Sequence, residues 1–515
     1  FIVKPDPAEK TTGTTTGKKT EAKTALSIRK GEHIVLLGSG LGSRMNHFGH
    51  FETELHMRHP DNKLVIRNIC DEGNTPGFRP HPSRKSPWAF PGAEKFQTEL
   101  AKGSGSRGHY ETPDQWLTRL KTDTIIAFFG YNSSFNGPEG LDSFKGELGA
   151  FIRHTLNQKY NGKNPPQLAI VSPTAFQNLS AKYGTPDGKT TNANLNLYTR
   201  AMQEVCATHG VLFIDVFSPS KAAFDASKED LTTDGALLNN RGYAWLAPRL
   251  SDSLYGKYTG KIPPSRKAVH AAVSEKIWCW LNDYKMPNGV HVHGRRYNPF
   301  GPKNYPDELK KTREMTAVRD QAIWAAVQGE KFDLAAADAK THKLPPVQSN
   351  YKPSGKNGDP DYQPGATSQT KLTLPDGYQM GLFASEKEFT ALANPVQIAF
   401  DNKGRLWVAT MASYPHYRIG DPKPTDKLII LEDTNNDGKA DKQTIFAGDL
   451  HIPIGFEITA EGVYVSQSDS LVLLKDTDGD DQYDSKEVIL SGFDDHDTHH
   501  AISAFCADPS GAIMM

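Results

Sequence analysis

Between residues 31 and 256, short apolar segments alternate with segments of helical periodicity. The apolar segments are hydrophobic at consecutive positions, which is typical of parallel strands covered by helices on both faces of a sheet. The expected strands occupy residues 33–38, 63–69, 124–130, 167–173 and 211–217. The expected helices occupy residues 51–59, 114–121, 141–158, 192–209 and 240–254. The alternation therefore predicts a doubly wound α/β domain with a parallel sheet over residues 26–258.

The loops at the carboxyl ends of these strands are the expected functional region, because ligands of open α/β sheets bind there. These loops begin at Gly38, Asn68, Gly130 and Thr233. We therefore expect their polar groups to meet along one rim of the sheet.

Short motifs in these loops resemble the sequence blocks of the SGNH/GDSL hydrolases, which have a flavodoxin-like fold. Gly38-Ser39-Gly40-Leu41 follows the first strand, where that family has Gly-Asp-Ser-Leu. The remaining blocks resemble, in the same order, residues 68–73, 130–132 and 234–237. The resemblance implies that the Gly73 backbone N–H and the Asn132 side chain stand where the family places its two oxyanion donors.

The resemblance fails at the two positions that carry the family's chemistry. A hydroxyl nucleophile needs a histidine to take its proton and an acid to orient that histidine. Gly40 stands at the nucleophile position and Leu237 at the histidine position, whereas Asp234 keeps the acid. We therefore expect SGNH esterase activity to be absent. Ser39 and Ser43 are the alternative nucleophiles, and either would make the protein a carbohydrate esterase with a surrogate nucleophile.

The surviving motif residues also have purely structural interpretations. Glycine at position 73 suits a tight turn, and Asn132 or Asp234 can accept hydrogen bonds from the backbone of its own loop. A retained ligand pocket and simple loop capping both remain open for these residues.

A group of histidines lies on and just before the helix expected at residues 51–59. Its members are His47, His50, His56 and His59. Their spacing favours a solvated helix face over a metal site.

The chain between the first domain and the carboxyl-terminal region changes in composition. Residues 259–370 contain frequent proline and glycine, and residues 344–370 lack any periodicity. We expect an extension that packs on the first domain, followed by an interdomain linker with its boundary near residue 370. Residues 1–25 are expected to be a flexible tail.

Residues 371–515 have alternating strand patterns and repeat themselves. Leu431-Glu432-Asp433-Thr434 recurs as Leu474-Lys475-Asp476-Thr477, an offset of 43 residues (431 to 474). That spacing is near the roughly 40 to 50 residues of one propeller blade. We therefore predict the first blades of an all-β propeller. Because propellers need about four blades or more, the chain is expected to be a fragment of a longer protein.

Both copies of this repeat continue into loops that resemble calcium-binding loops, which place oxygen ligands at alternate positions. The candidate ligands of the first loop are Asp433, Asn435, Asp437 and Asp441. Those of the second loop are Asp476, Asp478, Asp480, Asp484 and Glu487. Ca²⁺ binding and capped polar hairpins remain equal alternatives.

The segment 394–400, the Asp-rich loops and Asp497-Thr498-His499-His500 resemble the start of the PVC-type membrane-bound dehydrogenase propeller. This family is named for Planctomycetes and Verrucomicrobia and is related to quinoprotein sugar dehydrogenases. The resemblance implies oxidation of a sugar or alcohol, with His499 or His500 as a possible base. It also implies a c-type haem domain in a region outside this chain, since the chain contains no Cys-x-x-Cys-His.

Charge and composition narrow the partners and the location. The formal net charge is -1, so nothing favours nucleic acid. No apolar stretch is long enough for a transmembrane segment. The start at Phe1 and the Thr- and Lys-rich residues 10–23 indicate a processed amino terminus. We therefore expect an exported protein of the periplasm or cell envelope.

Two classes of function remain open beside the surrogate esterase. In the first, a degenerate SGNH-like domain binds carbohydrate or docks a redox or envelope protein partner, and the propeller belongs to a haem-linked dehydrogenase. In the second, both domains are inert and form a non-enzymatic envelope scaffold or carbohydrate-binding protein.

Overall fold

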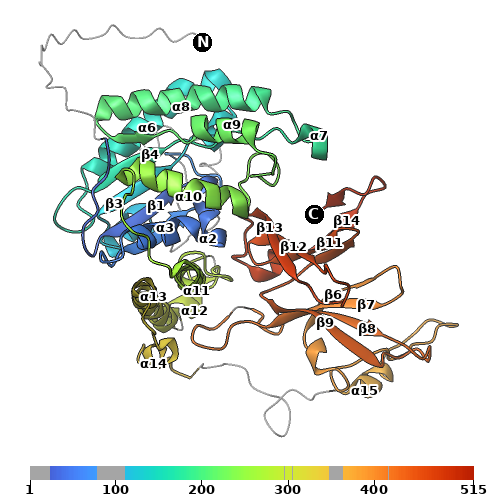
Figure 1. The fold of residues 1–515 in the computed structure, drawn as a ribbon. Helices are drawn as coiled ribbons and strands as arrows, with labels where there is room; N and C mark the ends of the chain where they lie inside the picture. The colour runs from blue at the N-terminus through green and yellow to red at the C-terminus, as the bar shows by residue number, and fades with distance from the viewer. Residues whose placement is uncertain (1–23, 78–110, 295, 304, 347–362, 416) are drawn as a thin grey trace, which may run out of the picture.

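The computed structural model describes residues 24–77, 111–346 and 363–515, except for residues 295, 304 and 416. The first domain contains a five-stranded sheet in the order β2-β1-β3-β4-β5, and all its neighbouring strands are parallel (Figure 1). The strands are β1 (His33–Gly38), β2 (Val65–Cys70), β3 (Thr124–Phe128), β4 (Gln167–Val171) and β5 (Leu212–Ile214). The predicted parallel α/β architecture is confirmed.

Helices cover both faces of the sheet because alternate strand residues point to opposite sides. Ile34 and Leu36 of β1 lie in a core shared with α3 (His50–Arg58) and α10 (Asn240–Tyr255). Val35 and Leu37 lie in a second core. Helices α4 (Pro113–Arg119), α6 (Leu141–Leu156) and α8 (Lys189–His209) contribute to that second core, together with Trp280 and Tyr284 from the extension.

Short helices complete the first domain. They are α1 (Gly40–Ser43), α2 (Met45–Phe48), α5 (Tyr131–Ser134), η3 (Gly137–Gly140), α7 (Ser180–Tyr183) and α9 (Phe217–Ala226). The first of these begins directly after β1, so the turn motif at residues 38–41 lies at the junction of a strand and a helix.

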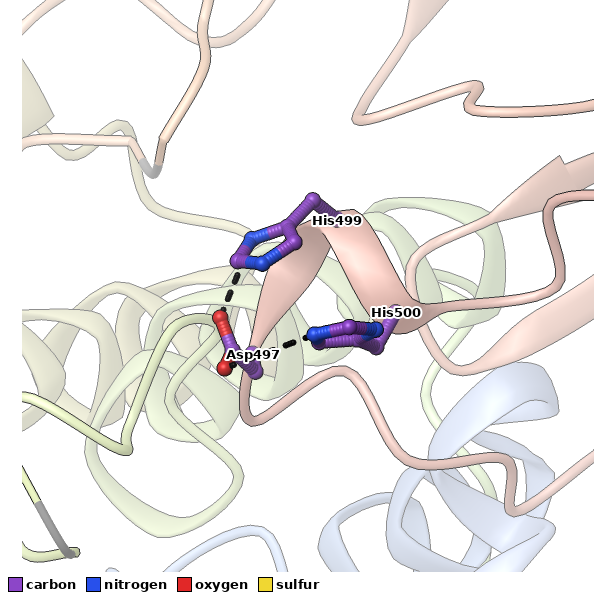
Figure 2. A group of neighbouring side chains, drawn as sticks. All are labelled: Asp497, His499 and His500. Carbon is purple, nitrogen blue, oxygen red and sulfur yellow. Dashed lines mark ion pairs between the residues drawn. The ribbon is translucent and has the colours of Figure 1, made fainter.

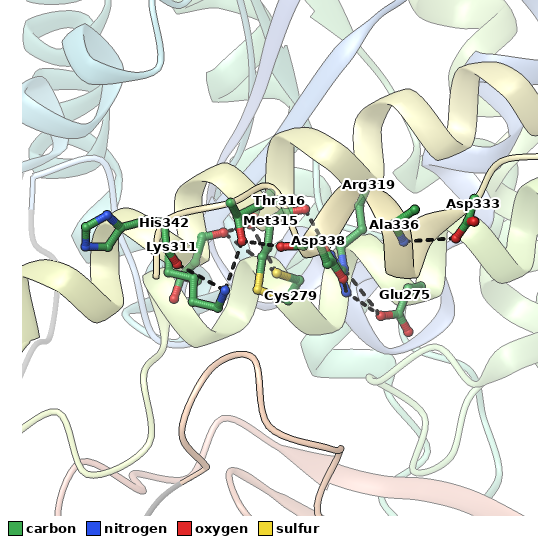
Figure 3. Close-up of polar contacts among 12 residues, drawn as sticks. Glu275, Cys279, Lys311, Met315, Thr316, Arg319, Asp333, Ala336, Asp338 and His342 are labelled. Atoms are coloured by element: carbon green, nitrogen blue, oxygen red, sulfur yellow. Dashed lines mark hydrogen bonds and ion pairs between the residues drawn. The ribbon is translucent and has the colours of Figure 1, made fainter. Parts of the chain in front are cut away.

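The extension is helical and packs on the first domain through buried polar contacts. Trp280 Nε1 donates to the Asn68 carbonyl at 2.8 Å, and Arg67 forms a buried ion pair with Asp320, with Nη1 to Oδ1 at 2.9 Å. The helices are α11 (Arg266–Tyr284), α12 (Tyr297–Lys303), α13 (Tyr305–Gln328) and α14 (Leu334–Asp338). Figure 3 shows Arg319 of α13 paired with Glu275 of α11 and Asp338 of α14.

The carboxyl-terminal region consists of antiparallel sheets that follow one another along the chain. After α15 (Gly365–Gln369) and η4 (Thr390–Leu392), two four-stranded sheets have the orders β6-β7-β8-β9 and β10-β11-β12-β13. The strands of the first are β6 (Pro395–Phe400), β7 (Leu406–Thr410), β8 (Asp426–Glu432) and β9 (Lys442–Leu450). Those of the second are β10 (Phe456–Thr459), β11 (Gly462–Gln467), β12 (Ser470–Lys475) and β13 (Ser485–Ser491). After η5 (Thr498–His500), β14 (Cys506–Ala507) pairs with β15 (Ile513–Met514).

The two four-stranded sheets share one hydrophobic core. It includes Trp407, Leu428 and Phe446 from the first sheet and Val465 and Leu474 from the second. The sheets therefore bury their facing surfaces against each other.

Candidate functional site

Hydrogen bonds connect the loops at the carboxyl ends of β1, β2 and β3. Ser39 N donates to the Phe128 carbonyl at 2.8 Å, and Asn74 Nδ2 donates to the Gly38 carbonyl at 3.0 Å. Asn132 Nδ2 donates to the Asn74 carbonyl at 3.3 Å. The turn motif, the loop that contains Gly73 and the loop that contains Asn132 therefore lie along one rim of the sheet.

Gly40 is the first residue of α1 and has room for a side chain. A Cβ atom built on it meets only Glu72 Cγ, at 3.9 Å. By contrast, a Cβ on Gly38 would lie 2.1 Å from the Phe128 carbonyl oxygen, and Gly38 has a positive φ of 125°. Glycine is required at position 38 by the close approach of two strands, whereas position 40 accepts a larger residue without steric conflict.

The two neighbouring serines are buried and engaged. Ser39 Oγ donates to the Phe128 carbonyl at 3.2 Å, and Ser43 Oγ accepts from Lys285 Nζ at 3.2 Å. Burial opposes the charge of Lys285, but the carboxylates of Glu72 and Asp469 outweigh burial and raise the pKa of the lysine. Lys285 therefore remains protonated and cannot take a proton from Ser43.

The loop that carries Asp234 and Leu237 is closed by its own hydrogen bonds. Asp234 Oδ1 accepts from the backbone N–H groups of Ala236 and Leu237, each at 2.8 Å. Burial and the nearby Asp234 carboxylate raise the pKa of Tyr131 to about 12. The carboxylate is present at the rim, but the side chain at position 237 is apolar.

The histidines near α3 are separately engaged, and the expectation of a solvated helix face was wrong. His50 Nε2 lies 2.7 Å from Asn240 Oδ1, and His56 is only 3% exposed, beside Glu52. Residues 51–58 are all buried, because α3 packs against α10, α11 and α13. Within the described part of the chain, His47, His50, His56 and His59 form no group with metal-ligand spacing.

Asp497 brings His499 and His500 together in the carboxyl-terminal region (Figure 2). His499 Nδ1 lies 3.0 Å from Asp497 Oδ1, and His500 Nε2 lies 3.9 Å from Asp497 Oδ2. The carboxylate is buried and also lies 3.6 Å from Arg296 Nη1, whereas both imidazoles are exposed. A carboxylate-held imidazole at the surface has the arrangement of a general base.

The two acidic loops differ in how their carboxylates are arranged. In the second loop, ligand atoms of Asp476, Asp478 and Asp484 lie within 4.8 Å of one another. Among the described residues, the carboxylates of Asp433, Asp437 and Asp441 form no such group.

Each loop also turns its own carboxylates toward backbone N–H groups. Asp433 accepts from Asp437 N at 3.1 Å and from Gly438 N at 2.7 Å, and Asn435 Oδ1 accepts from Asp437 N. In the second loop Asp480 Oδ1 accepts from Gln482 N, and Glu487 lies apart on β13 opposite Leu473. Three of the five candidate ligands of the second loop are therefore brought together.

Arg44 is a residue of this region that the sequence analysis did not identify. It follows α1, is 1% exposed, and donates from Nη2 to the Val488 carbonyl at 3.3 Å. Nearby, Gly492 packs so closely on Glu72 that an added Cβ would lie 2.4 Å from Glu72 Cγ. The second antiparallel sheet therefore docks beside the turn motif.

Sequence comparison matches two parts of the chain to protein families. Residues 82–245 match the GDSL-like Lipase/Acylhydrolase family, and residues 365–515 match a domain of unknown function, DUF7133. The first match includes Asn132, Asp234 and Leu237 but begins after Gly40 and Gly73. No curated protein sequence matches the chain.

Several solved structures are similar to part of the chain at low identity. One is BT4096, a gut microbial diltiazem-metabolizing enzyme, which is 13% identical with a TM-score of 0.32. The match covers 45% of this chain and 48% of that chain. Another is a catalytic mutant of Axe2, an acetylxylan esterase from Geobacillus stearothermophilus, which is 12% identical with a TM-score of 0.31. The match covers 46% of this chain and 100% of that chain. A third is a putative GDSL-like lipase from Parabacteroides merdae, which is 12% identical with a TM-score of 0.31. The match covers 44% of this chain and 98% of that chain. The chain spans about half the length of the first of these structures. Together with the five-stranded parallel sheet, the family match identifies a GDSL-like lipase/acylhydrolase domain in this chain.

Proposed function

We propose that the GDSL-like domain does not hydrolyse esters and serves as a non-catalytic platform for the carboxyl-terminal β region. The observation that carries the proposal is the pair of side chains at positions 40 and 237, which are a glycine and a leucine. Neither can attack a carbonyl or accept a proton, so these positions supply neither the nucleophile nor the base that this type of hydrolysis requires.

The alternative nucleophiles do not favour a surrogate esterase. Ser39 uses its hydroxyl proton in a bond to the Phe128 carbonyl, and Ser43 faces a protonated lysine. Neither serine has a base within reach of its hydroxyl among the hydrogen bonds described above.

Docking of the β region next to the turn motif supports the platform role. Arg44 and Glu72, which flank the motif positions 40 and 73, both contact the segment 488–492. Arg44 and Glu72 therefore hold the second antiparallel sheet next to motif positions 40 and 73.

We infer that this β region is the beginning of a propeller. Two successive four-stranded antiparallel sheets share a core, and their Asp-rich loops follow β8 and β12 at an offset of 43 residues (433 to 476). This repetition is what blades require. We also propose export to the periplasm or cell envelope. The described residues include no helix that is long and apolar enough to cross a bilayer.

A second candidate function is oxidation of a sugar or alcohol by the β region, favoured by the pairing of His499 with Asp497. His499 would take the hydroxyl proton, and the hydrogen on the same carbon would leave as hydride to a quinone-type acceptor, so that the alcohol becomes a carbonyl and the acceptor is reduced by two electrons. The residues present do not fit a c-type haem, because Cys70, Cys206, Cys279 and Cys506 form no Cys-x-x-Cys-His. Reduction of a soluble dye by the chain in the presence of sugars, and its loss in His499→Gln, would support this candidate.

Hydrolysis of p-nitrophenyl acetate tests the main proposal. The unaltered chain should give a rate equal to that of Gly40→Ala. Faster hydrolysis by the unaltered chain, lost in Ser39→Ala or Ser43→Ala, would refute the proposal.

A further inference from the structure

Two imidazoles and one carboxylate converge at the η5 turn of the β region (Figure 2). The His499 and His500 rings approach different oxygens of the Asp497 carboxylate, at 3.0 Å and 3.9 Å. One ligand atom from each of the three residues lies within 4.8 Å of the other two. Bonds of about 2.0–2.2 Å to a single ion place its ligand atoms at most about 4 Å apart. The three side chains are therefore close to the spacing that a shared metal ion requires.

The turn itself brings these side chains to one side. Residues i and i+3 of a 3₁₀ turn lie on the same face, and His500 N donates to the Asp497 carbonyl at 2.7 Å. The His499 and His500 ring centroids are only 4.2 Å apart. The imidazoles are 39% and 66% exposed, so small rotations of these rings can complete the coordination without repacking a core.

The backbone on both sides of Asp497 is held by neighbouring segments. From the extension, Val290 N donates to the His496 carbonyl at 2.9 Å. From the β region, Thr498 Oγ1 donates to the Pro415 carbonyl at 2.9 Å, and Thr498 is fully buried. The segment that carries the ligands is thus fixed before an ion binds, which lowers the entropic cost of binding.

The donor set determines which ions fit. Two imidazoles and one carboxylate suit Zn²⁺, Cu²⁺, Ni²⁺ or Fe²⁺, whereas Ca²⁺ and Mg²⁺ prefer oxygen ligands alone. Arg296 Nη1 lies 3.6 Å from Asp497 Oδ1 and is a cation that a metal ion would displace. Its side chain is 44% exposed, so the guanidinium can turn into solvent. Three protein ligands also leave coordination positions open for water or for a ligand from a partner.

We propose that Asp497, His499 and His500 bind one divalent transition-metal ion. The proposal rests neither on the absence of ester hydrolysis nor on sugar oxidation. It gives His499 a different role from the second candidate function, because an imidazole bound to a metal through Nδ1 carries hydrogen on Nε2 and cannot accept another proton. Metal binding is measured without sugar or dye, so the failure of either assignment is seen separately.

Zinc titration of the full chain, stripped of metal with a chelator, tests the proposal. Cys506 is exposed and the other three cysteines are buried, so Cys506→Ser is the background for all proteins. Excess Ca²⁺ keeps the acidic loops from competing for zinc. We expect one zinc ion per chain with a Kd below about 100 μM. Co²⁺ in place of zinc should give visible d–d absorption without a thiolate charge-transfer band, since the ligands are nitrogen and oxygen.

Replacement of the two imidazoles assigns the site. His499→Gln and His500→Gln should each weaken zinc binding at least about tenfold, since loss of groups that only orient metal ligands already costs about 10–100-fold. Both side chains are exposed, so thermal unfolding without zinc should not change. His496→Gln is the matched control, because His496 lies beside the turn but its Nδ1 is 3.1 Å from Asp494 Oδ1, in a separate group. This control should bind zinc as tightly as the background protein.

Three results would overturn the proposal. The first is zinc binding weaker than about 100 μM. The second is unchanged affinity in both His499→Gln and His500→Gln, and the third is loss of binding in His496→Gln alone. Circular dichroism of each variant establishes that it is folded.

Discussion

Arg44 Nη1 donates a hydrogen bond of 3.0 Å to Ser491 Oγ, which joins the residue after α1 to the last strand of the second antiparallel sheet. The same guanidinium donates to the carbonyls of Leu238 and Val488. A buried arginine with three acceptors, two of them in the β region, ties the rim of the GDSL-like domain to its neighbour. The contact therefore joins the two domains close to the turn motif.

Replacement of this arginine should loosen the interface. We expect Arg44→Met to lower the free energy of unfolding by about 2–3 kcal/mol, because hydrogen bonds from a buried charged group are lost. Urea titration followed by circular dichroism measures the change, and hydrogen exchange in residues 485–491 should become faster. Arg249→Met is the control, since Arg249 is exposed beside Trp245 and should change stability by less than about 0.5 kcal/mol. An equal effect of both substitutions would contradict the docking role of Arg44.

Glu147 should make stability depend on pH. Burial raises its pKa from 4.5 to about 7, although Thr75 and Gly77 donate to it. The folded chain therefore holds a proton between about pH 4.5 and 7 that the unfolded chain releases, so stability falls as pH rises through this window. The total loss should be about 3 kcal/mol, since one pKa unit corresponds to about 1.4 kcal/mol.

The variant Glu147→Gln isolates this effect. Its free energy of unfolding, measured in urea from pH 4.5 to 8, should lack the decline seen in the unaltered chain. Glu204→Gln changes an exposed glutamate that pairs with Lys145 and should keep the decline. A decline of the same size in Glu147→Gln would show that other groups cause it.

Calcium should distinguish the two acidic loops. We propose that the second loop binds Ca²⁺, because three of its carboxylates already lie within 4.8 Å of one another. Titration calorimetry should give one site per chain, lost in Asp478→Asn and kept in Asp433→Asn. Two equivalent sites, or one site lost only in Asp433→Asn, would contradict this assignment.

The sheet of the first domain was predictable because its strands are short, apolar on both faces and separated by amphipathic helices. β1 was expected at residues 33–38 and occupies His33–Gly38, and the other strands differ from expectation by a few residues at their ends. Strand ends are set by turns such as the positive-φ Gly130, whose geometry local hydrophobicity does not encode.

The surroundings of the rim were less predictable, because they depend on contacts between residues far apart in the sequence. His56 looked like a solvated helical residue, but α11 and α13 arrive from more than 200 positions later and bury α3. The role of Arg44 depends in the same way on Ser491, which lies 447 residues away. The sequence around Arg44 gave no indication of this contact.

The most direct measurement of the central claim is covalent labelling by a serine-directed fluorophosphonate, read by intact-protein mass spectrometry. The unaltered chain should remain unlabelled, because position 40 has no hydroxyl and position 237 has no base. The double variant Gly40→Ser, Leu237→His should gain one label, since a Cβ at position 40 meets nothing closer than 3.9 Å. Labelling of the unaltered chain at Ser39 or Ser43 would contradict the account of a non-catalytic domain.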